Sequence, residues 1–273
     1  MMIEFRRRTG IGMLSGGWTC RQRRDDPMEI VVLPTKQELG KAAATFAAER
    51  INAAIAARKA ANIILATGAS QFEMFASLVT QPVDWRRVTA FHLDEYVGLP
   101  ESHRAGLGRY LKERFLAKLS RHPRAFHFID GRGDPIVECA RISGIIRKHP
   151  IDVALVGIGE NGHLAFNDPP ADFDTREPFI VVAPDEAARR QQVGEGWFDT
   201  LEEVPTQAIS VSIRQIMSSR TIVCAVPDER KAQAIRNTAE GELSNMIPAS
   251  ILRQHADCRL FLDPPAASLL TKK

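Results

Sequence analysis

Short apolar runs alternate with amphipathic segments along most of the chain. The apolar runs have the length of strands and are bounded by turn residues, whereas the segments between them repeat their apolar residues at helical spacing. The pattern predicts strands near 29–33, 62–66, 88–93, 125–129, 151–156, 178–182, 208–212, 220–226 and 258–262. It predicts helices from residue 35 and near 71–79, 105–119, 135–148, 185–192, 228–239 and 247–254.

Strands that alternate with helices indicate an α/β fold, with a doubly wound, mostly parallel sheet and helices on both faces. The first helix has the clearest start, because Thr35 and Glu38 have the spacing of a capping box. The chain shows no internal repeat and no linker after residue 28. We therefore expect residues 28–273 to form a single domain.

Residues 1–27 differ from the rest of the chain. They have no helical or strand period, and their six arginines against three acidic residues give a charge of +3. The remainder holds 30 basic and 30 acidic residues, so nothing in it suggests a nucleic-acid surface. We expect the native domain to start at Met28, with residues 1–27 disordered or derived from upstream sequence; a targeting arm is the alternative.

The composition, 44% hydrophobic and 25% charged, is ordinary for a soluble globular protein. No apolar run approaches the roughly 20 residues of a membrane span. The four cysteines and seven histidines lack metal-ligand spacing, so no metal is expected. We expect a cytoplasmic protein with reduced thiols and no membrane or nucleic-acid partner.

The segment from Gly157 to Pro170, GIGENGHLAFNDPP, directly follows the predicted strand 151–156 and is called the central loop below. Its glycines match the dinucleotide pattern G-x-G-x-x-G, but the prolines at its end leave about two helical turns at most. Nucleotide binding is therefore the minor interpretation. His163 could pass a proton between a sugar ring oxygen and a hydroxyl, as histidine side chains do in acid–base catalysis, with Asp168 as its partner. A single histidine after a glycine loop is more often structural, but other polar strand ends favour a function here.

Three further polar groups lie at strand ends or helix starts, and a parallel sheet would bring them to one edge. Thr67-Gly68-Ala69-Ser70 suits an anion at a helix N-terminus, although a tight turn capped by serine is an equal alternative. Asp94 could act as a base on a C–H next to a carbonyl, or could cap a turn. Lys231 could reach an anion, or could be a solvated surface lysine.

Together these segments resemble the glucosamine-6-phosphate deaminase/isomerase family. The matching residues are ATGAS at 66–70, FHLDEYVGLP at 91–100, the central loop and ERKAQAI at 229–235, and the resemblance covers about residues 29–265. It implies a Rossmann-like fold that converts glucosamine 6-phosphate and water into fructose 6-phosphate and ammonia. The chemistry is acid–base throughout, so the resemblance implies no cofactor.

The resemblance also implies a role for each matched residue. Asp94 would be the base that moves a proton between C2 and C1, and His163 would help to open the pyranose ring. Asn161 and Asp168 would support them. The phosphate would be held by Thr67, Gly68, Ala69, Ser70 and Lys231.

The chain departs from the family pattern at four places. Some members have Asp in place of Asn161 and Glu in place of Asp168, and a proline is common where this chain has Gln71. The fourth departure is the family's second phosphate-binding cation, an arginine just before an aromatic–Phe–Asp segment. Here Glu195-Gly196 precedes that segment, so either Arg189 or Arg190 substitutes or the anion specificity differs.

Two other functions compete with deamination. The related 6-phosphogluconolactonases follow their Gly-His with Thr-Ala-Ser-Leu-Phe-Pro, whereas Leu164-Ala-Phe-Asn-Asp-Pro169 sides with deamination. A sugar-phosphate sensor without turnover is the second alternative. The expected partner is a small phosphosugar in each case. A homo-oligomer is compatible with the sequence, which does not choose among the phosphosugars.

Overall fold

The computed structural model describes residues 18–19 and 28–271. Almost all of the segment 1–27 lies outside these residues, so the predicted start of the domain stays a prediction. The two described residues, β1 (Trp18–Thr19), pair antiparallel with β2 (Met28–Val32).

Seven parallel strands form the centre of the molecule, as the alternating pattern predicted. Along the sheet the order is β1-β2-β11-β10-β7-β3-β4-β6. The chain direction across the sheet reverses between β3 and β7, which makes their carboxyl ends the topological switch point where ligands bind in such folds. The remaining bounds are β3 Ala61–Leu65, β4 Val88–His92, β6 Ala125–His127, β7 Val153–Val156, β10 Thr221–Val226 and β11 Cys258–Leu262.

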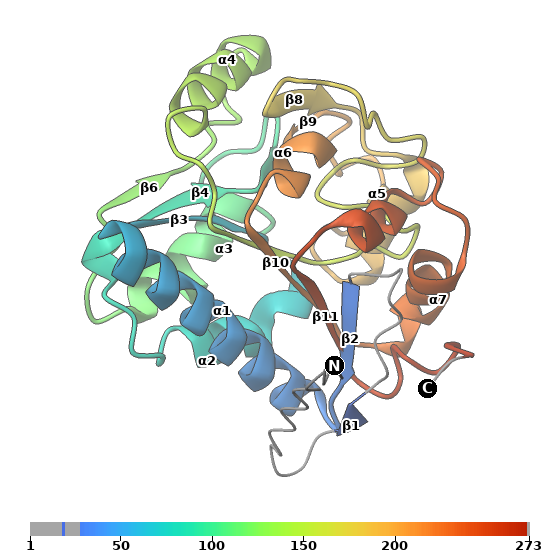
Figure 1. Cartoon of the computed structure of the whole chain (residues 1–273). Coiled ribbons are helices and arrows are strands. Elements are labelled where there is room, and N and C mark those ends of the chain that lie inside the picture. Colours follow the sequence, from blue (N-terminus) through green and yellow to red (C-terminus); the bar gives the residue numbers. More distant parts are fainter. Residues whose placement is uncertain (1–17, 20–27, 272–273) are drawn as a thin grey trace, which may run out of the picture.

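Helices cover both faces of this sheet (Figure 1). Alternate residues of a strand point to opposite faces, so Ile63 and Leu65 pack under one set of helices and Ile64 under the other. The first set is α1 (Lys36–Arg58), α2 (Phe72–Leu78) and α3 (Leu107–Arg114). The second is α4 (Pro135–Ile146), α6 (Ile213–Met217), α7 (Ala232–Glu240) and the 3-10 helix Pro248–Gln254.

The predicted capping box is confirmed at the start of α1. Oγ1 of Thr35 accepts a hydrogen bond from the backbone N–H of Glu38 at 3.2 Å, which satisfies one of the free donors of the first turn. Asp134 and Asp185 cap α4 and α5 (Glu186–Gly194) in the same way.

The structure differs from the sequence prediction in its second sheet. β5 (Asp94–Tyr96), β9 (Ala208–Val211) and β8 (Phe179–Val182) form a separate antiparallel sheet beside the carboxyl ends of the main strands. The predicted strand 88–93 therefore ends at His92, and Asp94 begins a strand that pairs with β9. Apolar runs of this length fit parallel and antiparallel pairing equally well, so periodicity did not separate the sheets.

Helix lengths differ in detail as well. The predicted helix 105–119 ends at Arg114 and continues as a 3-10 turn at Leu116–Lys118, while α6 was not predicted because five residues are too short for a helical period. Across residues 18–19 and 28–271, none of the helices is long and apolar enough to cross a bilayer.

Candidate active site

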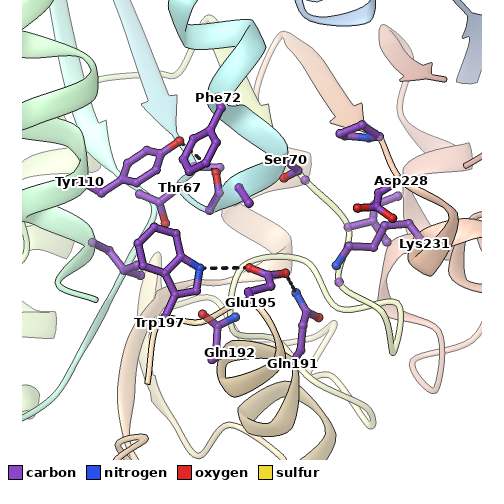
Figure 2. A pocket seen from close by; sticks show the side chains of 18 of the residues that line it. Thr67, Ser70, Phe72, Tyr110, Gln191, Gln192, Glu195, Trp197, Asp228 and Lys231 are labelled. Atoms are coloured by element: carbon purple, nitrogen blue, oxygen red, sulfur yellow. Dashed lines mark hydrogen bonds between the residues drawn. The ribbon is translucent and has the colours of Figure 1, made fainter. Parts of the chain in front are cut away.

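A cavity of about 610 Å³ lies at the carboxyl edge of the main sheet, at the switch point between β3 and β7. Its walls include the loops that follow β3, β4, β7 and β10, together with the end of α5 and the residues after it (Figure 2). Seven of the nine predicted site residues line it, namely Thr67, Gly68, Ala69, Ser70, Asp94, His163 and Lys231. Asn161 and Asp168 do not line the cavity, but both contact His163.

The predicted anion-binding segment 67–70, called the anion loop below, turns sharply between β3 and α2. Gly68 has φ +96°, a conformation that side chains with a Cβ rarely adopt, and a 3-10 turn at Ala69–Gln71 follows it. The hydroxyl of Tyr110 donates to the carbonyl of Gly68 at 2.9 Å, which fixes the loop from α3. Free backbone N–H groups at the start of such a turn suit a phosphate.

Gln71 stands where the family often has proline, and its fully buried side chain has a defined role. Its Nε2 donates to Oγ of Ser70 at 3.0 Å and to the carbonyl of Ala225 at 3.2 Å, so it ties the anion loop to β10. A Cβ at Gly157 would lie 3.0 Å from this amide and 3.2 Å from Oγ of Ser70. The first glycine of the central loop therefore makes room for the anion loop.

Lys231 lies at the end of the 3-10 turn Glu229–Lys231, just before α7, and only 5% of its surface is exposed. Burial lowers the pKa of Lys231, and the negative charges of Glu195 and Glu160 oppose that shift. The alternative of a solvated surface lysine is therefore wrong. A buried ammonium at the cavity wall is available to an anion.

Asp94 is buried at the floor of the cavity, 6% exposed. Burial, with the charge of Glu95 adding to it, raises the pKa of Asp94 to about 8. Among the described residues, Oδ1 of Asp94 has no hydrogen-bond partner. Glu95 differs, because its carboxylate accepts three backbone N–H groups, those of Tyr96 at 2.9 Å, Leu107 at 3.1 Å and Gly108 at 2.7 Å. Of the two acids, Asp94 is the free one.

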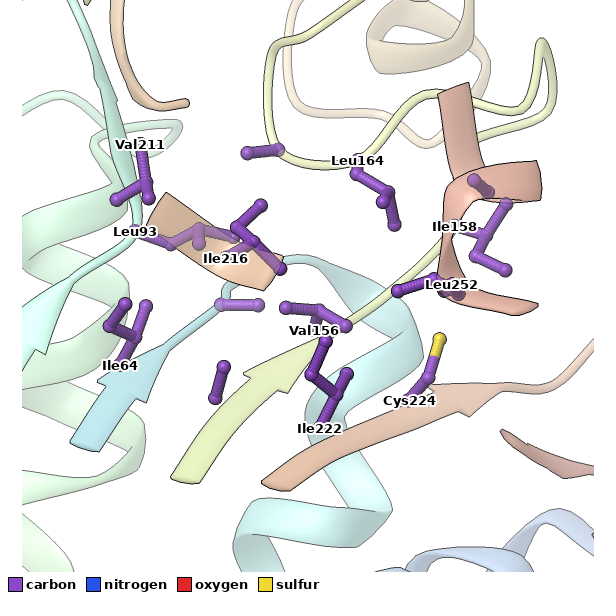
Figure 3. Close-up of a cluster of buried hydrophobic side chains, with 14 of the residues drawn as sticks. Ile64, Leu93, Val156, Ile158, Leu164, Val211, Ile216, Ile222, Cys224 and Leu252 are labelled. Atoms are coloured by element: carbon purple, nitrogen blue, oxygen red, sulfur yellow. The ribbon is translucent and has the colours of Figure 1, made fainter. Parts of the chain in front are cut away.

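His163 is held by the central loop rather than by a helix. Its backbone carbonyl accepts from the N–H of Gly159 at 3.0 Å, and its ring packs so closely on Gly159 that a Cβ there would lie 2.3 Å from the imidazole. Leu164 and Ile158 anchor the loop in the buried cluster above Val156 (Figure 3). The segment forms no helix, so the structure lacks the second half of a dinucleotide fingerprint here.

The imidazole of His163 lies next to Asp168. Its Nδ1 is 2.9 Å from Oδ1 of Asp168, close enough for an ion pair but not aligned as a regular hydrogen bond. Burial would raise the pKa of Asp168, but its contacts with His163 and Asn161 outweigh burial and hold the pKa below its usual value. An ionised Asp168 can orient the ring and stabilise its protonated form.

Asn161 connects this pair to a third acid that the sequence did not reveal. Its Nδ2 donates to Oδ1 of Asp168 at 2.9 Å and to Oδ2 of Asp185 at 3.0 Å, while its Oδ1 accepts from the N–H of His163 at 3.1 Å. Asp185 also donates its N–H to Asp168 at 2.8 Å. The neutral amide of Asn161 avoids placing three carboxylates together, as an aspartate here would do.

Neither nearby arginine replaces the missing phosphate-binding cation. The guanidinium of Arg189 donates to the carbonyls of Leu201 and Val204, and exposed Arg190 pairs with Glu186. Neither side chain lines the cavity, whereas Glu195 does. The first of the two alternatives is therefore wrong, and the wall carries a carboxylate instead.

The structure also brings residues into the cavity wall that the sequence pattern did not single out. They are Phe72, Tyr96, Arg104, Tyr110 and Trp197. Within the part of the chain that the structure describes, no group of three His, Cys, Asp or Glu side chains could hold a metal ion.

A family model described as glucosamine-6-phosphate isomerases/6-phosphogluconolactonase matches residues 34–261. The chain belongs to this family. It is 34% identical to a glucosamine-6-phosphate deaminase of Lactobacillus delbrueckii subsp. bulgaricus, over 89% of this chain and 100% of the relative. It is 38% identical to the deaminase of Exiguobacterium sibiricum, over 76% of this chain and 80% of the relative.

Solved structures agree with this membership of the glucosamine-6-phosphate isomerase/6-phosphogluconolactonase family. A monomeric glucosamine-6-phosphate deaminase superposes with a TM-score of 0.80 at 30% identity, covering 88% of this chain and 99% of the other. A 6-phosphogluconolactonase from Shewanella baltica superposes with a TM-score of 0.72 at 18% identity, covering 88% and 98%. The second likeness shows only the shared fold, and both support the predicted Rossmann-like α/β class.

Proposed function

We propose that this protein is a deaminating aldose–ketose isomerase that converts glucosamine 6-phosphate and water into fructose 6-phosphate and ammonia. The observation that carries the proposal is the placement of Asp94, His163 and Lys231 on one cavity. The reaction requires a carbon base, a group that opens the sugar ring and a cation for the phosphate. These functions are supplied by the buried carboxylate of Asp94, by His163 beside Asp168 and by the buried ammonium of Lys231. The named deaminases at 34% and 38% identity support the same reaction.

The phosphate binds first in this mechanism. The backbone N–H groups and hydroxyls of Thr67, Gly68, Ala69 and Ser70 contact its oxygens, and Lys231 neutralises part of its charge. Binding this end of the sugar fixes C1 and C2 relative to the acid–base groups, which lowers the entropic part of the barrier.

Ring opening and enolisation follow. His163, oriented by Asp168, donates a proton to the ring oxygen as the C1 hydroxyl loses one, which gives the open-chain aldehyde. Asp94 then takes the proton from C2 while the C1 carbonyl oxygen gains a proton, and returns its proton to C1. The amino nitrogen loses one proton as the C=N double bond forms at C2, so the protons balance. Water adds to C2 and ammonia leaves, which gives the ketone of fructose 6-phosphate.

The environment of Asp94 suits this role. A carboxylate whose pKa is raised to about 8 is a much stronger base than an exposed aspartate, and desolvation produces that shift here. At pH 7 roughly a tenth of such a group is ionised, so the gain in basicity exceeds the loss in population.

Ammonia release from glucosamine 6-phosphate by the purified full chain tests the proposal. We expect release by the parent protein and a loss on the order of 10³-fold in Asp94→Asn, within the range for removal of a general base. Asp84→Asn is the matched control, because Asp84 is partly exposed, pairs with Arg86 and Arg87 and does not line the cavity. A folded parent that releases no ammonia would exclude the proposed reaction.

A non-catalytic sugar-phosphate sensor is the second candidate. It is favoured by Glu195-Gly196, which stand before Trp197 where the family has a phosphate-binding arginine. Saturable phosphosugar binding without turnover would support the sensor. The cytoplasmic location and a homo-oligomer stay predictions.

A further inference from the structure

Residues 191–197 form the cavity wall opposite the anion loop. Gln191, Glu195 and Trp197 point into the cavity from it, and Thr67 and Ser70 lie across the space (Figure 2). None of these three wall residues has a role in the mechanism above.

The carboxylate of Glu195 is held in one orientation by two donors. Nε2 of Gln191 donates to its Oε1 at 2.8 Å, and Nε1 of Trp197 donates to its Oε2 at 3.1 Å. Oε1 of Gln191 accepts from the backbone N–H of Glu160 at 3.1 Å, so the arrangement is tied to the central loop. A carboxylate has about four acceptor positions, so each oxygen keeps one beyond the donor already bound.

Glu195 lines the same cavity as Lys231, at the phosphate end of the proposed substrate site, and Asp94, at the carbon end. Its charge acts on Lys231 at the phosphate end, opposing the effect of burial on that pKa. It also adds to the effect of burial and Asp94 on the pKa of Tyr96, which follows the proposed carbon base. A sugar phosphate that spans these ends would present its middle carbons to this carboxylate.

The same wall carries an aromatic surface. The ring of Trp197 meets Phe72 and Tyr110 edge-on, with centroids 6.5 Å and 6.4 Å apart, and Nε of Arg104 donates to the carbonyl of Trp197 at 3.1 Å. An aromatic ring beside a fixed acceptor suits a sugar, because the C–H face of a sugar packs on the ring while its hydroxyls donate.

We propose that Glu195 is a specificity-determining residue whose two free acceptor positions bind adjacent hydroxyl groups in the middle of the phosphosugar, beside the Trp197 ring. The inference rests on the proposed function and names the part of the substrate that Glu195 recognises, the hydroxyl groups in the middle of the sugar. A carboxylate at this wall favours a neutral diol and repels a second phosphate or a sugar acid. The expected arginine would instead have favoured additional negative charge.

Calorimetric binding of glucose 6-phosphate and 4-deoxyglucose 6-phosphate tests this without turnover. We expect the missing hydroxyl to weaken binding to the parent roughly tenfold, since hydrogen bonds to charged groups are the stronger ones. In Glu195→Gln the penalty should fall to about threefold or less, and in Glu195→Ala it should disappear. Glu186→Gln, the same substitution on the exposed side of α5, should keep the full penalty.

The outcomes separate the two proposals. An equal deoxy penalty in the parent and in both Glu195 variants would overturn the inference while leaving the deaminase proposal intact. Uniformly tighter binding of both sugars by Glu195→Gln would also overturn it, because the carboxylate would then only oppose the phosphate. A folded parent that binds neither sugar would overturn the inference, whereas ammonia release from glucosamine 6-phosphate decides the deaminase proposal separately.

Discussion

Nδ2 of Asn161 lies 2.9 Å from Oδ1 of Asp168 and donates a hydrogen bond to it. The same amide group reaches Asp185, so one neutral side chain separates two carboxylates directly behind the catalytic histidine proposed here. An aspartate at position 161 would add a third negative charge to this pair of acids. We therefore expect the identities of the residues at 161 and 185 to be coupled.

Asn161→Asp should lower kcat/KM on the order of tenfold, because three neighbouring carboxylates raise one another's pKa values and one of them will bind a proton. Asp168 would then be a weaker partner for His163. Ammonia release at pH 7 measures the effect.

The double variant Asn161→Asp, Asp185→Asn returns the cluster to two carboxylates and one amide, although the amide then no longer lies between the two acids. We expect it to recover part of the activity that Asn161→Asp loses, because the third charge is gone. Additive losses in the double variant would contradict the coupling.

The activity should depend on the ionisation of Asp94. Since the pKa of Asp94 is raised to about 8 and the base must be ionised, kcat/KM should rise with pH up to about 8 and then level off. A pH–rate profile of the parent from pH 5 to 9.5 measures this. In the upper half of that range the substrate phosphate is already ionised, so its own titration does not contribute. A profile that is flat between pH 6.5 and 8.5 would exclude Asp94 as the titrating base.

Stability should depend on the same group with the opposite sign. The folded state holds the proton of Asp94 up to about pH 8, whereas an unfolded aspartate loses it near 3.8, so stability falls as the pH rises between these values. Asp94→Asn removes this dependence. Its free energy of unfolding should exceed that of the parent by at least about 1 kcal/mol at pH 9, and the difference should shrink towards pH 5.

Urea unfolding at the two pH values checks this prediction, with Asp84→Asn as the control. A difference between the parent and Asp94→Asn that does not change with pH would mean that Asp94 is ionised in the folded protein across the range.

The order of strands and helices could be predicted from the sequence because apolar periodicity and turn residues are local signals. The capping box at Thr35 and the strand ends at Thr67 and Gly157 show this. The antiparallel pairing of β5 could not be predicted, because the run before Asp94 reads the same in either sheet.

The site divides in the same way. Residues at the carboxyl ends of parallel strands, such as Thr67 and His163, were predicted to meet at one edge of the sheet. Partners whose contact depends on how a helix packs were not predicted. Asp185 looks like an ordinary helix cap in the sequence, and its contact with Asn161 depends on how α5 packs over the central loop. The inward orientation of Glu195 could not be predicted from the sequence either, because it depends on donors from Gln191 and Trp197.

Gly159→Ala should reduce activity with little effect on the fold. A Cβ at Gly159 would lie 2.3 Å from the imidazole of His163, so the ring must move, and a displacement of about 1 Å in a catalytic group can cost on the order of 10²-fold in rate. Gly159 does not have a positive φ, so the backbone itself tolerates alanine. Gly133→Ala, where a Cβ meets nothing within 4 Å, is the matched control and should keep full activity. The measurement is kcat for ammonia release beside the thermal midpoint of each variant. Because the phosphate contacts lie on other loops, KM should change less than kcat, and an unchanged kcat would show that the position of the His163 ring is not required for turnover.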